Sequence, residues 1–425
     1  MKLRASLTLF SVLGSISSVA APLPVWRPFS DDSPWNQPIP AAARTDSDSS
    51  AAIGDFASRG ALYINIQDWS IPVYFVDADQ TPRREVYDLR PDVFGRGFEF
   101  PRRIPIPANA VASPPVDGDN HLCIIDRQKN LEWGMWWARK DAKGEWGTGL
   151  GAVADLAGTG VNTPWYGEAR QLDAHRARAS GFPLIAGLIR VEEIRAGRIN
   201  HALIFAYDHC RTGFFVPPAS TAQATVPGTR NSTGVPMGGR IQLDPSWDVE
   251  HSALTRSGKI IARALQEYGA YCGDYAGANV LFAENSPEAV KAWAGLLDRE
   301  DLMAVFTPKM IQEHFRLLDL GNVLPGQNCE IPPPYLLSFQ FKNPAASARI
   351  DCLTHTVAIA VPSSVDVSKL VPTFTVFERG TRVLVNGAEQ ISGRSSGDFT
   401  RQTVYRLVAP DGTTADWNVL VTRDP

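Results

Sequence analysis

The strongest constraint on the fold is a series of short segments that alternate apolar and polar residues and end at turn-forming residues. Such alternation is typical of half-buried β-strands. Asp411-Gly412 separates the last two of these segments and predicts a tight turn between them. In the C-terminal part of the chain the predicted strands are 336–341, 356–361, 373–377, 404–408 and 417–421. Their close spacing predicts an Ig-like β-sandwich.

The preceding part of the chain has the same strand pattern with a few amphipathic segments added. Residues 127–130 are polar and predict a hairpin turn between two of the strands. Three segments predict helices, at 252–268, 286–297 and 307–318. The predicted strands are 61–66, 71–76, 122–126, 131–138, 199–207 and 240–243. We therefore expect a mainly β protein, with a β-sandwich or jelly-roll-like N-terminal domain that carries peripheral helices.

The chain of 425 residues is long enough for two or three domains. A stiff, proline-rich stretch at 324–334 predicts a linker. We expect a signal peptide at 1–21, a β-rich catalytic domain at 22–323 and the Ig-like module at 335–425. The module offers no residues that suggest catalysis.

The N-terminus predicts secretion. Lys2 and Arg4 precede the apolar stretch 7–19, and small residues follow at a suitable cleavage point. That stretch is too short and too rich in serine to span a bilayer well, so no membrane association is expected. A sequon at Asn231 fits an extracellular glycoprotein. The formal net charge of −4 gives no reason to expect nucleic acid as a partner.

Five cysteines fit an oxidising compartment, and their odd number leaves at least one unpaired. Cys123 and Cys272 form one conceivable disulfide, with both thiols free as the alternative. If they pair on strands, His121 and Asp274 share the face of the bridge, because each is two residues away. Cys329 and Cys352 form a second conceivable pair, which leaves Cys210 as the unpaired thiol.

Two stretches of the C-terminal module, VPSSVDVSKLVPTFTV at 361–376 and VYRLVAPDGTTADWNVLVT at 404–422, carry a resemblance. They resemble the Ig-like repeats of secreted bacterial proteins. The resemblance covers about a fifth of the chain and implies a spacer or attachment module.

Three stretches of the first domain carry another resemblance: DSPWNQPIP, GFPLIAGLIRVEEIRAGRINHALIFA and VPMGGRIQL. They resemble secreted proteins of actinomycetes and fungi that have no settled function and are often joined to carbohydrate-binding modules. This resemblance implies secretion and a polysaccharide context, and it implies no mechanism.

Histidines are the first candidates for chemistry, since imidazole is the usual acid or base near neutral pH. His121 begins a predicted strand beside a polar loop, where it either meets a ligand or is satisfied by loop carbonyls. His201 shares its face with Phe205 and Tyr207, which predicts either a core or the wall of a cleft. Asp274 is a candidate to orient or acidify an imidazole.

Carboxyl, aromatic and cationic side chains complete the candidates. Glu132 lies among tryptophans, which either raise its pKa by desolvation or simply pack in a core. Arginines at the ends of strands or apolar runs are suited to clamp a uronate carboxylate, although a structural ion pair is the plainer role. We expect catalytic roles for His121, His201, Asp274, Glu132, Arg190 and Tyr271, and substrate binding by Trp133, Trp136, Arg240 and Tyr275.

These residue types allow three functions. A polysaccharide lyase needs a His or Tyr base and an arginine that neutralises a uronate, and it is the favoured hypothesis. A glycoside hydrolase needs two carboxyl groups, for which Glu132 with Asp126, Asp155 or Asp274 is available. The third is a glycan-binding or wall-associated protein without catalysis. We expect a monomer that acts on a polysaccharide or oligosaccharide and needs no cofactor. No metal is expected either, since neither an HExxH nor a complete EF-hand motif occurs, and a site formed by His121, His201 and Asp274 is the alternative.

Overall fold

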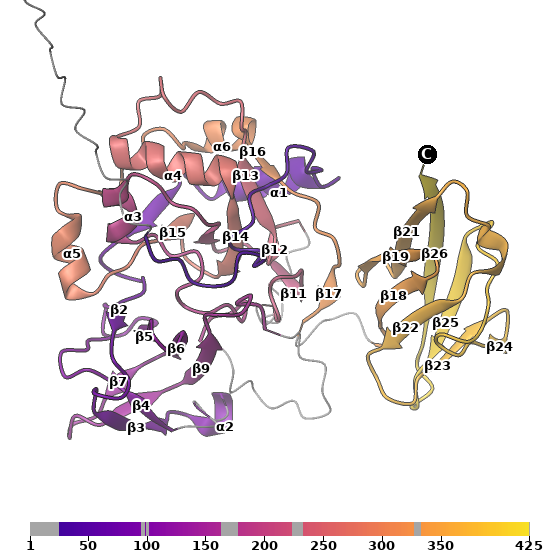
Figure 1. The fold of residues 1–425 in the computed structure, drawn as a ribbon, viewed down its shortest axis with the longest axis horizontal. Helices are drawn as coiled ribbons and strands as arrows, with labels where there is room; N and C mark the ends of the chain where they lie inside the picture. Colours follow the sequence, from indigo (N-terminus) through magenta and orange to yellow (C-terminus); the bar gives the residue numbers. More distant parts are fainter. Residues whose placement is uncertain are drawn as a thin grey trace, which may run out of the picture.

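The computed structural model describes residues 25–94, 98, 102–162, 177–222, 233–326 and 333–424. The expected signal peptide, the sequon at Asn231 and Cys329 lie outside these residues. Within them the protein is mainly β, with several sheets and few helices, as the sequence predicts. Figure 1 shows the β-rich C-terminal part apart from a larger body that carries the helices.

The centre of the larger body is a mixed six-stranded sheet. Its strands β10 and β14 are parallel, whereas β10 with β15 and β14 with β13 are antiparallel. The order across the sheet is β1 (Tyr63–Asn65), β15 (Val280–Phe282), β10 (Leu203–Ala206), β14 (Ala270–Asp274), β13 (Arg240–Leu243) and β16 (Phe315–Leu317). Most of these strand residues are buried, so the sheet lies inside the body.

A second sheet contains the predicted hairpin. The turn at 127–130 joins β5 (Leu122–Asp126) to β6 (Leu131–Trp136), and Asn130 adopts a left-handed conformation in it. The two faces of β5 contribute to different apolar clusters: Cys123 and Ile125 to the main core, Leu122 and Ile124 to a smaller one. The order of this sheet is β2 (Val73–Phe75), β5, β6 and β9 (Leu150–Asp155).

Two smaller sheets complete the larger body. One has the order β4 (Arg103–Pro105), β3 (Arg83–Asp88), β8 (Trp146–Thr148) and β7 (Arg139–Lys140). The other has the order β12 (Pro236–Met237), β11 (Arg211–Phe215) and β17 (Leu324–Pro325). The first two residues of the expected linker therefore pair with β11.

The three predicted helices are present, and each is shorter than predicted. Thr255 caps α4 (Arg256–Glu267), and Ser286 caps α5 (Pro287–Trp293), each through its hydroxyl. The predicted helix 307–318 ends early, because α6 (Pro308–His314) gives way to β16, which pairs with β13. Pairing at a sheet edge outweighs local helix preference there. The other helices are α1 (Ser49–Ser58), α2 (Pro91–Phe94) and α3 (Val191–Ala196).

The C-terminal part is a β-sandwich, as the sequence predicts. Its sheets are β19-β18-β22 and β20-β21-β26-β25-β23-β24. Aromatic side chains fill its core; Phe339, for example, meets Tyr405 edge to face at 5.4 Å between ring centroids. The strands are β18 (Leu336–Lys342), β19 (Ala345–Ser347), β20 (Arg349–Asp351), β21 (Thr356–Pro362), β22 (Pro372–Val376), β23 (Arg382–Val385), β24 (Ala388–Glu389), β25 (Thr403–Val408) and β26 (Thr414–Asp424). A short 3-10 turn, Val367–Lys369, precedes β22.

Polar contacts join the sandwich to the larger body. Val323 bridges to Asp351, and its N–H donates to the carbonyl of Ile350 at 2.8 Å. The guanidinium of Arg349 reaches Asp46 at 3.2 Å and Asp319 at 2.9 Å. The carboxylate of Asp46 is only 2% exposed, whereas the Arg349 side chain is 38% exposed, so only the acidic partner of this ion pair is shielded from water.

Candidate functional site

The best candidate site begins where β5 begins. The N–H groups of Trp137 and Ala138 donate to the carbonyls of Asp119 and Asn120, so the pairing of β5 with β6 continues through these residues. The indole Nε1 of Trp136 donates to the carboxylate of Asp119 at 3.0 Å and fixes its orientation. Asp119 is only partly buried, whereas His121, two residues on, is 3% exposed.

Arg178 is the centre of this site. Its guanidinium is fully buried; Nη2 donates to the carbonyl of Leu184 at 3.4 Å, and Nη1 lies 3.6 Å from the carboxylate of Asp274. The Nε and Nη1 atoms have no hydrogen-bond partner among the described residues. A buried guanidinium with unused donors is costly unless another group satisfies them. The charges of Asp274, Glu132 and Asp119 all act on it.

Asp274 ends β14, and its side chain is 17% exposed. The pKa of Asp274 is raised to about 6, because burial and the negative charge of Asp119 raise it more than the charge of Arg178 lowers it. A carboxyl group with this pKa exchanges its proton close to neutral pH. The same residue is therefore able to donate a proton and to accept one.

His121 also interacts electrostatically with Arg178. Its Nε2 is 3.2 Å from the carbonyl of Ala177. Burial lowers the pKa of His121 to about 4; Arg178 lowers it too, against the opposing charge of Asp119. The imidazole is therefore neutral at neutral pH. Because a carbonyl only accepts, we assign the proton to Nε2, which leaves Nδ1 as the acceptor.

Glu132 holds the backbone segment next to Arg178 in place. Its carboxylate accepts hydrogen bonds from the N–H groups of Leu184 (2.7 Å) and Ile185 (3.0 Å), and burial raises its pKa. It thus anchors the segment whose carbonyl holds Arg178. Of its tryptophan neighbours, Trp133 is 3% exposed within the smaller core, so its face is closed to a sugar, whereas Trp136 is partly exposed.

His201 and Arg190 belong to a separate buried network. The Nε2 of His201 lies 2.9 Å from Glu193, and Arg190 contacts the same carboxylate at 2.6 Å. Burial alone would raise the pKa of Glu193, but Arg190 and His201 outweigh it and lower that pKa to about 2. Arg190 also bonds the carbonyl of Trp26. The network fastens α3 and the N-terminal segment.

Arg240 and Tyr271 lie together at a third place, beside a small cavity of about 250 Å³. The guanidinium of Arg240 is 5.0 Å from the Tyr271 ring, and it donates to the carbonyls of Tyr268 (2.7 Å) and Gln37 (2.9 Å). The hydroxyl of Tyr271 donates to the carbonyl of Pro34 at 3.3 Å. Tyr275, by contrast, follows Asp274 and is 51% exposed.

The disulfide between Cys123 and Cys272 that the sequence suggested is not formed. Cys123 is a free thiol that hydrogen-bonds Glu132, and Cys272 lies beside Cys210 with 3.5 Å between the sulfur atoms. The pairing is wrong, and the alternative of two free thiols is confirmed. Cys210 is an unpaired thiol, as expected, although it lies beside Cys272. The pairing of Cys329 with Cys352 involves a residue outside the described ones.

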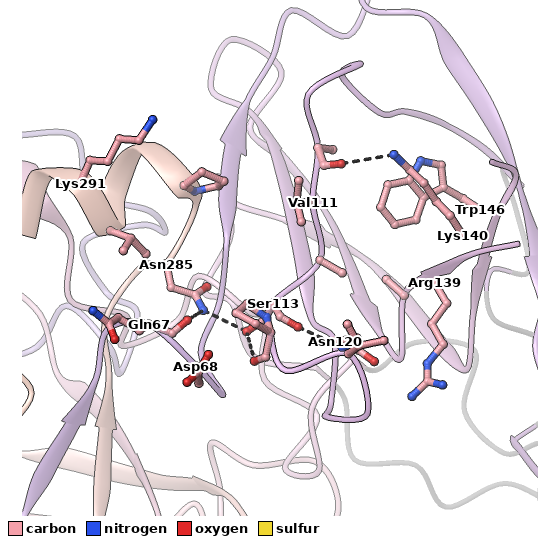
Figure 2. A pocket seen from close by; sticks show the side chains of 17 residues that line it. Gln67, Asp68, Val111, Ser113, Asn120, Arg139, Lys140, Trp146, Asn285 and Lys291 are labelled. Atoms are coloured by element: carbon pink, nitrogen blue, oxygen red, sulfur yellow. Dashed lines mark hydrogen bonds between the residues drawn. The ribbon is translucent and has the colours of Figure 1, made fainter. Parts of the chain in front are cut away.

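A groove of about 860 Å³ lies near the candidate site, between the β7–β8 region and α5. Figure 2 shows the amides of Asn120 and Asn285 held by hydrogen bonds on its floor, with Ser113 between them. Lys140 and Lys291 lie along its rim. None of the residues predicted from the sequence to act in catalysis or binding lines this groove.

Sequence reasoning missed Asp119 and Arg178 as site residues. Asp119 belongs to Asp117-Gly118-Asp119, which begins like a calcium-binding loop without completing one, and Arg178 has no motif around it. Among the described residues, no group of three His, Cys, Asp or Glu side chains is arranged to hold a metal ion. In the same residues, every helix is too short or too polar to cross a membrane.

Comparison with known proteins finds a similarity for the C-terminal part. Residues 336–421 match the family described as SGBP, N-terminal, the N-terminal domain of surface glycan-binding proteins. The match begins and ends within the β-sandwich. The first domain is outside this match.

Two solved structures from Bacteroides are similar to the chain over short lengths. One is a candidate glycoside hydrolase from Bacteroides thetaiotaomicron, with 25% identity, a TM-score of 0.18, and 22% of this chain and 27% of that one covered. The other is a candidate secreted protein from Bacteroides fragilis, with 26% identity, a TM-score of 0.16, and coverage of 19% and 71%. The chain thus spans about a quarter of the first of these. No curated protein matches the chain.

Proposed function

We propose that the protein is a secreted, carbohydrate-active enzyme that hydrolyses glycosidic bonds at the Arg178 site. The observation that carries the proposal is the set of carboxyl groups, Asp119, Glu132 and Asp274, whose charges all act on one buried guanidinium that has unused donors. Glycoside hydrolysis needs two carboxyl groups with different roles. The match of the sandwich to a glycan-binding family supports carbohydrate as the substrate class.

Asp274 is the proposed acid and Asp119 the proposed base. The protonated carboxyl of Asp274 gives its proton to the glycosidic oxygen as the bond from that oxygen to the anomeric carbon breaks. Asp119 takes a proton from a water molecule, whose oxygen bonds to the anomeric carbon. The raised pKa of Asp274 suits the acid, and the partial exposure of Asp119 suits a group that meets water.

Arg178, His121 and Trp136 have supporting roles in this proposal. Arg178 is fully buried and acts through its charge, which stabilises the carboxylate that Asp274 becomes. Neutral His121 offers Nδ1 as an acceptor for a sugar hydroxyl. Trp136, partly exposed and bonded to Asp119, offers an edge for a sugar ring.

The lyase hypothesis is less well supported. Arg190 already pairs with Glu193 and Arg240 with two backbone carbonyls, so neither is available as a neutraliser of a uronate. His201, one of the two bases considered, is bonded to Glu193. His121 with Arg178 is the remaining pair that suits a lyase.

The domain arrangement completes the proposal. Residues 22–323 form the catalytic domain, 324–334 the connection and 335–425 the glycan-binding module, in a monomer that follows a signal peptide at 1–21. The ion pairs of Arg349 with Asp46 and Asp319 support a fixed contact between module and catalytic domain. A module held in this way keeps the active site near a bound polysaccharide.

The test is product analysis with a panel of neutral and uronate polysaccharides. We expect new reducing ends without the absorbance of unsaturated products, and we expect Asp274→Asn and Asp119→Asn to form them much more slowly. Each single variant should lower the rate at least about 100-fold, the usual contribution of general acid–base catalysis. Unsaturated products would establish the lyase instead. Binding without any product would leave the non-catalytic hypothesis.

A further inference from the structure

Two buried amide oxygens on the floor of the 860 Å³ groove have no hydrogen-bond partner in the part of the chain that the structure describes. These are Oδ1 of Asn120 and Oδ1 of Asn285, in residues that are 5% and 3% exposed. Their Nδ2 atoms are fully engaged: Asn120 donates to the carbonyls of Ser113 and Pro115, and Asn285 donates to the carbonyl of Gln67 and the hydroxyl of Ser113. Both amides are therefore fixed, and their oxygens need donors from a bound molecule or water.

The rim of the groove is positively charged. Among the described residues that line the groove, three carry a positive charge and one, Asp68, carries a negative charge, an excess of two positive charges. The three cations are Arg139, Lys140 and Lys291. The whole chain has a formal net charge of −4, so the groove is positively charged on a protein whose overall charge is negative. The Nε of Arg139 is buried and has no hydrogen-bond partner within the described residues, so this side chain contributes to the rim through its charge.

The walls between floor and rim are mainly apolar. Val111, Pro114 and Val290 are among the residues that form them, and Val111 is 54% exposed. Sugar rings combine apolar C–H faces with hydroxyl edges, so they suit apolar walls next to fixed amide acceptors. A uronate adds a carboxylate, which suits the cationic rim.

We propose that this groove is a second carbohydrate-binding site that takes an acidic oligosaccharide of the uronate class. Hydroxyl groups of the sugar donate to Asn120 and Asn285, and its carboxylates meet Lys140, Lys291 and Arg139. The inference deepens the proposed function, on which it rests, because it names the substrate class and a subsite apart from Asp119 and Asp274.

The test is calorimetric titration with a short oligogalacturonate, with a cello-oligosaccharide of the same length as the neutral probe. Both are titrated into the double variant that combines Asp119→Asn with Asp274→Asn, so that neither probe is cleaved. We expect the acidic probe to bind at least about tenfold more tightly than the neutral one, and to lose most of its affinity in high salt. Equal affinities, or no binding of the acidic probe, would overturn the inference.

Variants locate the site. The triple change Arg139→Gln, Lys140→Gln and Lys291→Gln should weaken oligogalacturonate binding at least about tenfold, a loss of about 1.4 kcal/mol. Lys309→Gln on α6, also exposed, is the matched control and should bind as before. Unchanged binding by the triple variant would overturn the groove assignment. Should binding behave as expected while the wild-type chain cleaves no polysaccharide, the groove stands and the proposed hydrolysis fails, so the two failures are distinguishable.

Discussion

Replacing Asp274 by asparagine should change how the stability of the protein depends on pH. The pKa of Asp274 is raised to about 6, whereas an aspartate in an unfolded chain has its ordinary value near 3.9. The folded state therefore holds this proton more tightly. Its stabilising effect is fully present below about pH 4 and is lost as the pH rises to about 6. Two pH units correspond to about 3 kcal/mol in the free energy of unfolding.

Urea unfolding of both proteins between pH 4 and pH 7 measures this effect. We expect the Asp274→Asn variant to lack the decline, so that its stability relative to the wild type increases by about 3 kcal/mol from pH 4 to pH 7. Asp155→Asn, at an exposed carboxyl group on β9, is the control and should show the wild-type dependence. Parallel curves for the wild type and the Asp274→Asn variant would refute the assignment of a raised pKa to Asp274.

Three further predictions concern other parts of the molecule. Arg178→Met should lower the free energy of unfolding by about 3–5 kcal/mol, because it leaves buried carboxyl groups without their cation. Calorimetry measures the loss, and an unchanged melting temperature would contradict the prediction. Oxidised glutathione should accept two protons and two electrons from Cys210 and Cys272 and leave one disulfide between them. Cys123 should still react with an alkylating reagent after denaturation. Peptide mass spectrometry identifies the bond, and a Cys123–Cys272 bridge would contradict the structure. Arg349→Ala should lower the free energy of unfolding by about 1–3 kcal/mol, because it leaves the buried carboxylate of Asp46 without its partner. The melting temperature should fall. Arg382→Ala, which removes an exposed ion pair, is the control and should leave the melting temperature unchanged.

The strands of this protein were predictable because alternation and turn residues are local signals. Segment 122–126 is β5 and segment 240–243 is β13, with the predicted bounds. The helix predicted to run to residue 318 shows the limit, since 315–317 instead pair with β13. That pairing depends on a strand more than 70 positions away, which no local window includes.

The candidate site was only partly predictable, for a related reason. His121 and Asp274 were singled out, and both lie next to Arg178, yet the disulfide that suggested their proximity does not form. Arg178 connects them instead, and it comes from a third segment that carries no motif. Residue type alone did not reveal that the Glu132 carboxylate accepts hydrogen bonds from two backbone N–H groups, or that Arg190 forms an ion pair with Glu193. Such roles follow from burial and partners, which depend on the complete fold.

The central claim is that Asp119 and Asp274 form the acid–base pair of a glycoside hydrolase. The most direct measurement is the pH dependence of kcat/KM on whichever polysaccharide of the panel is cleaved, together with the same profile for Asp274→Asn. The account predicts a loss of activity above about pH 6, as Asp274 loses its proton, and no such limb in the residual activity of the variant. A variant that cleaves as fast as the wild type, with the same alkaline limb, would contradict it.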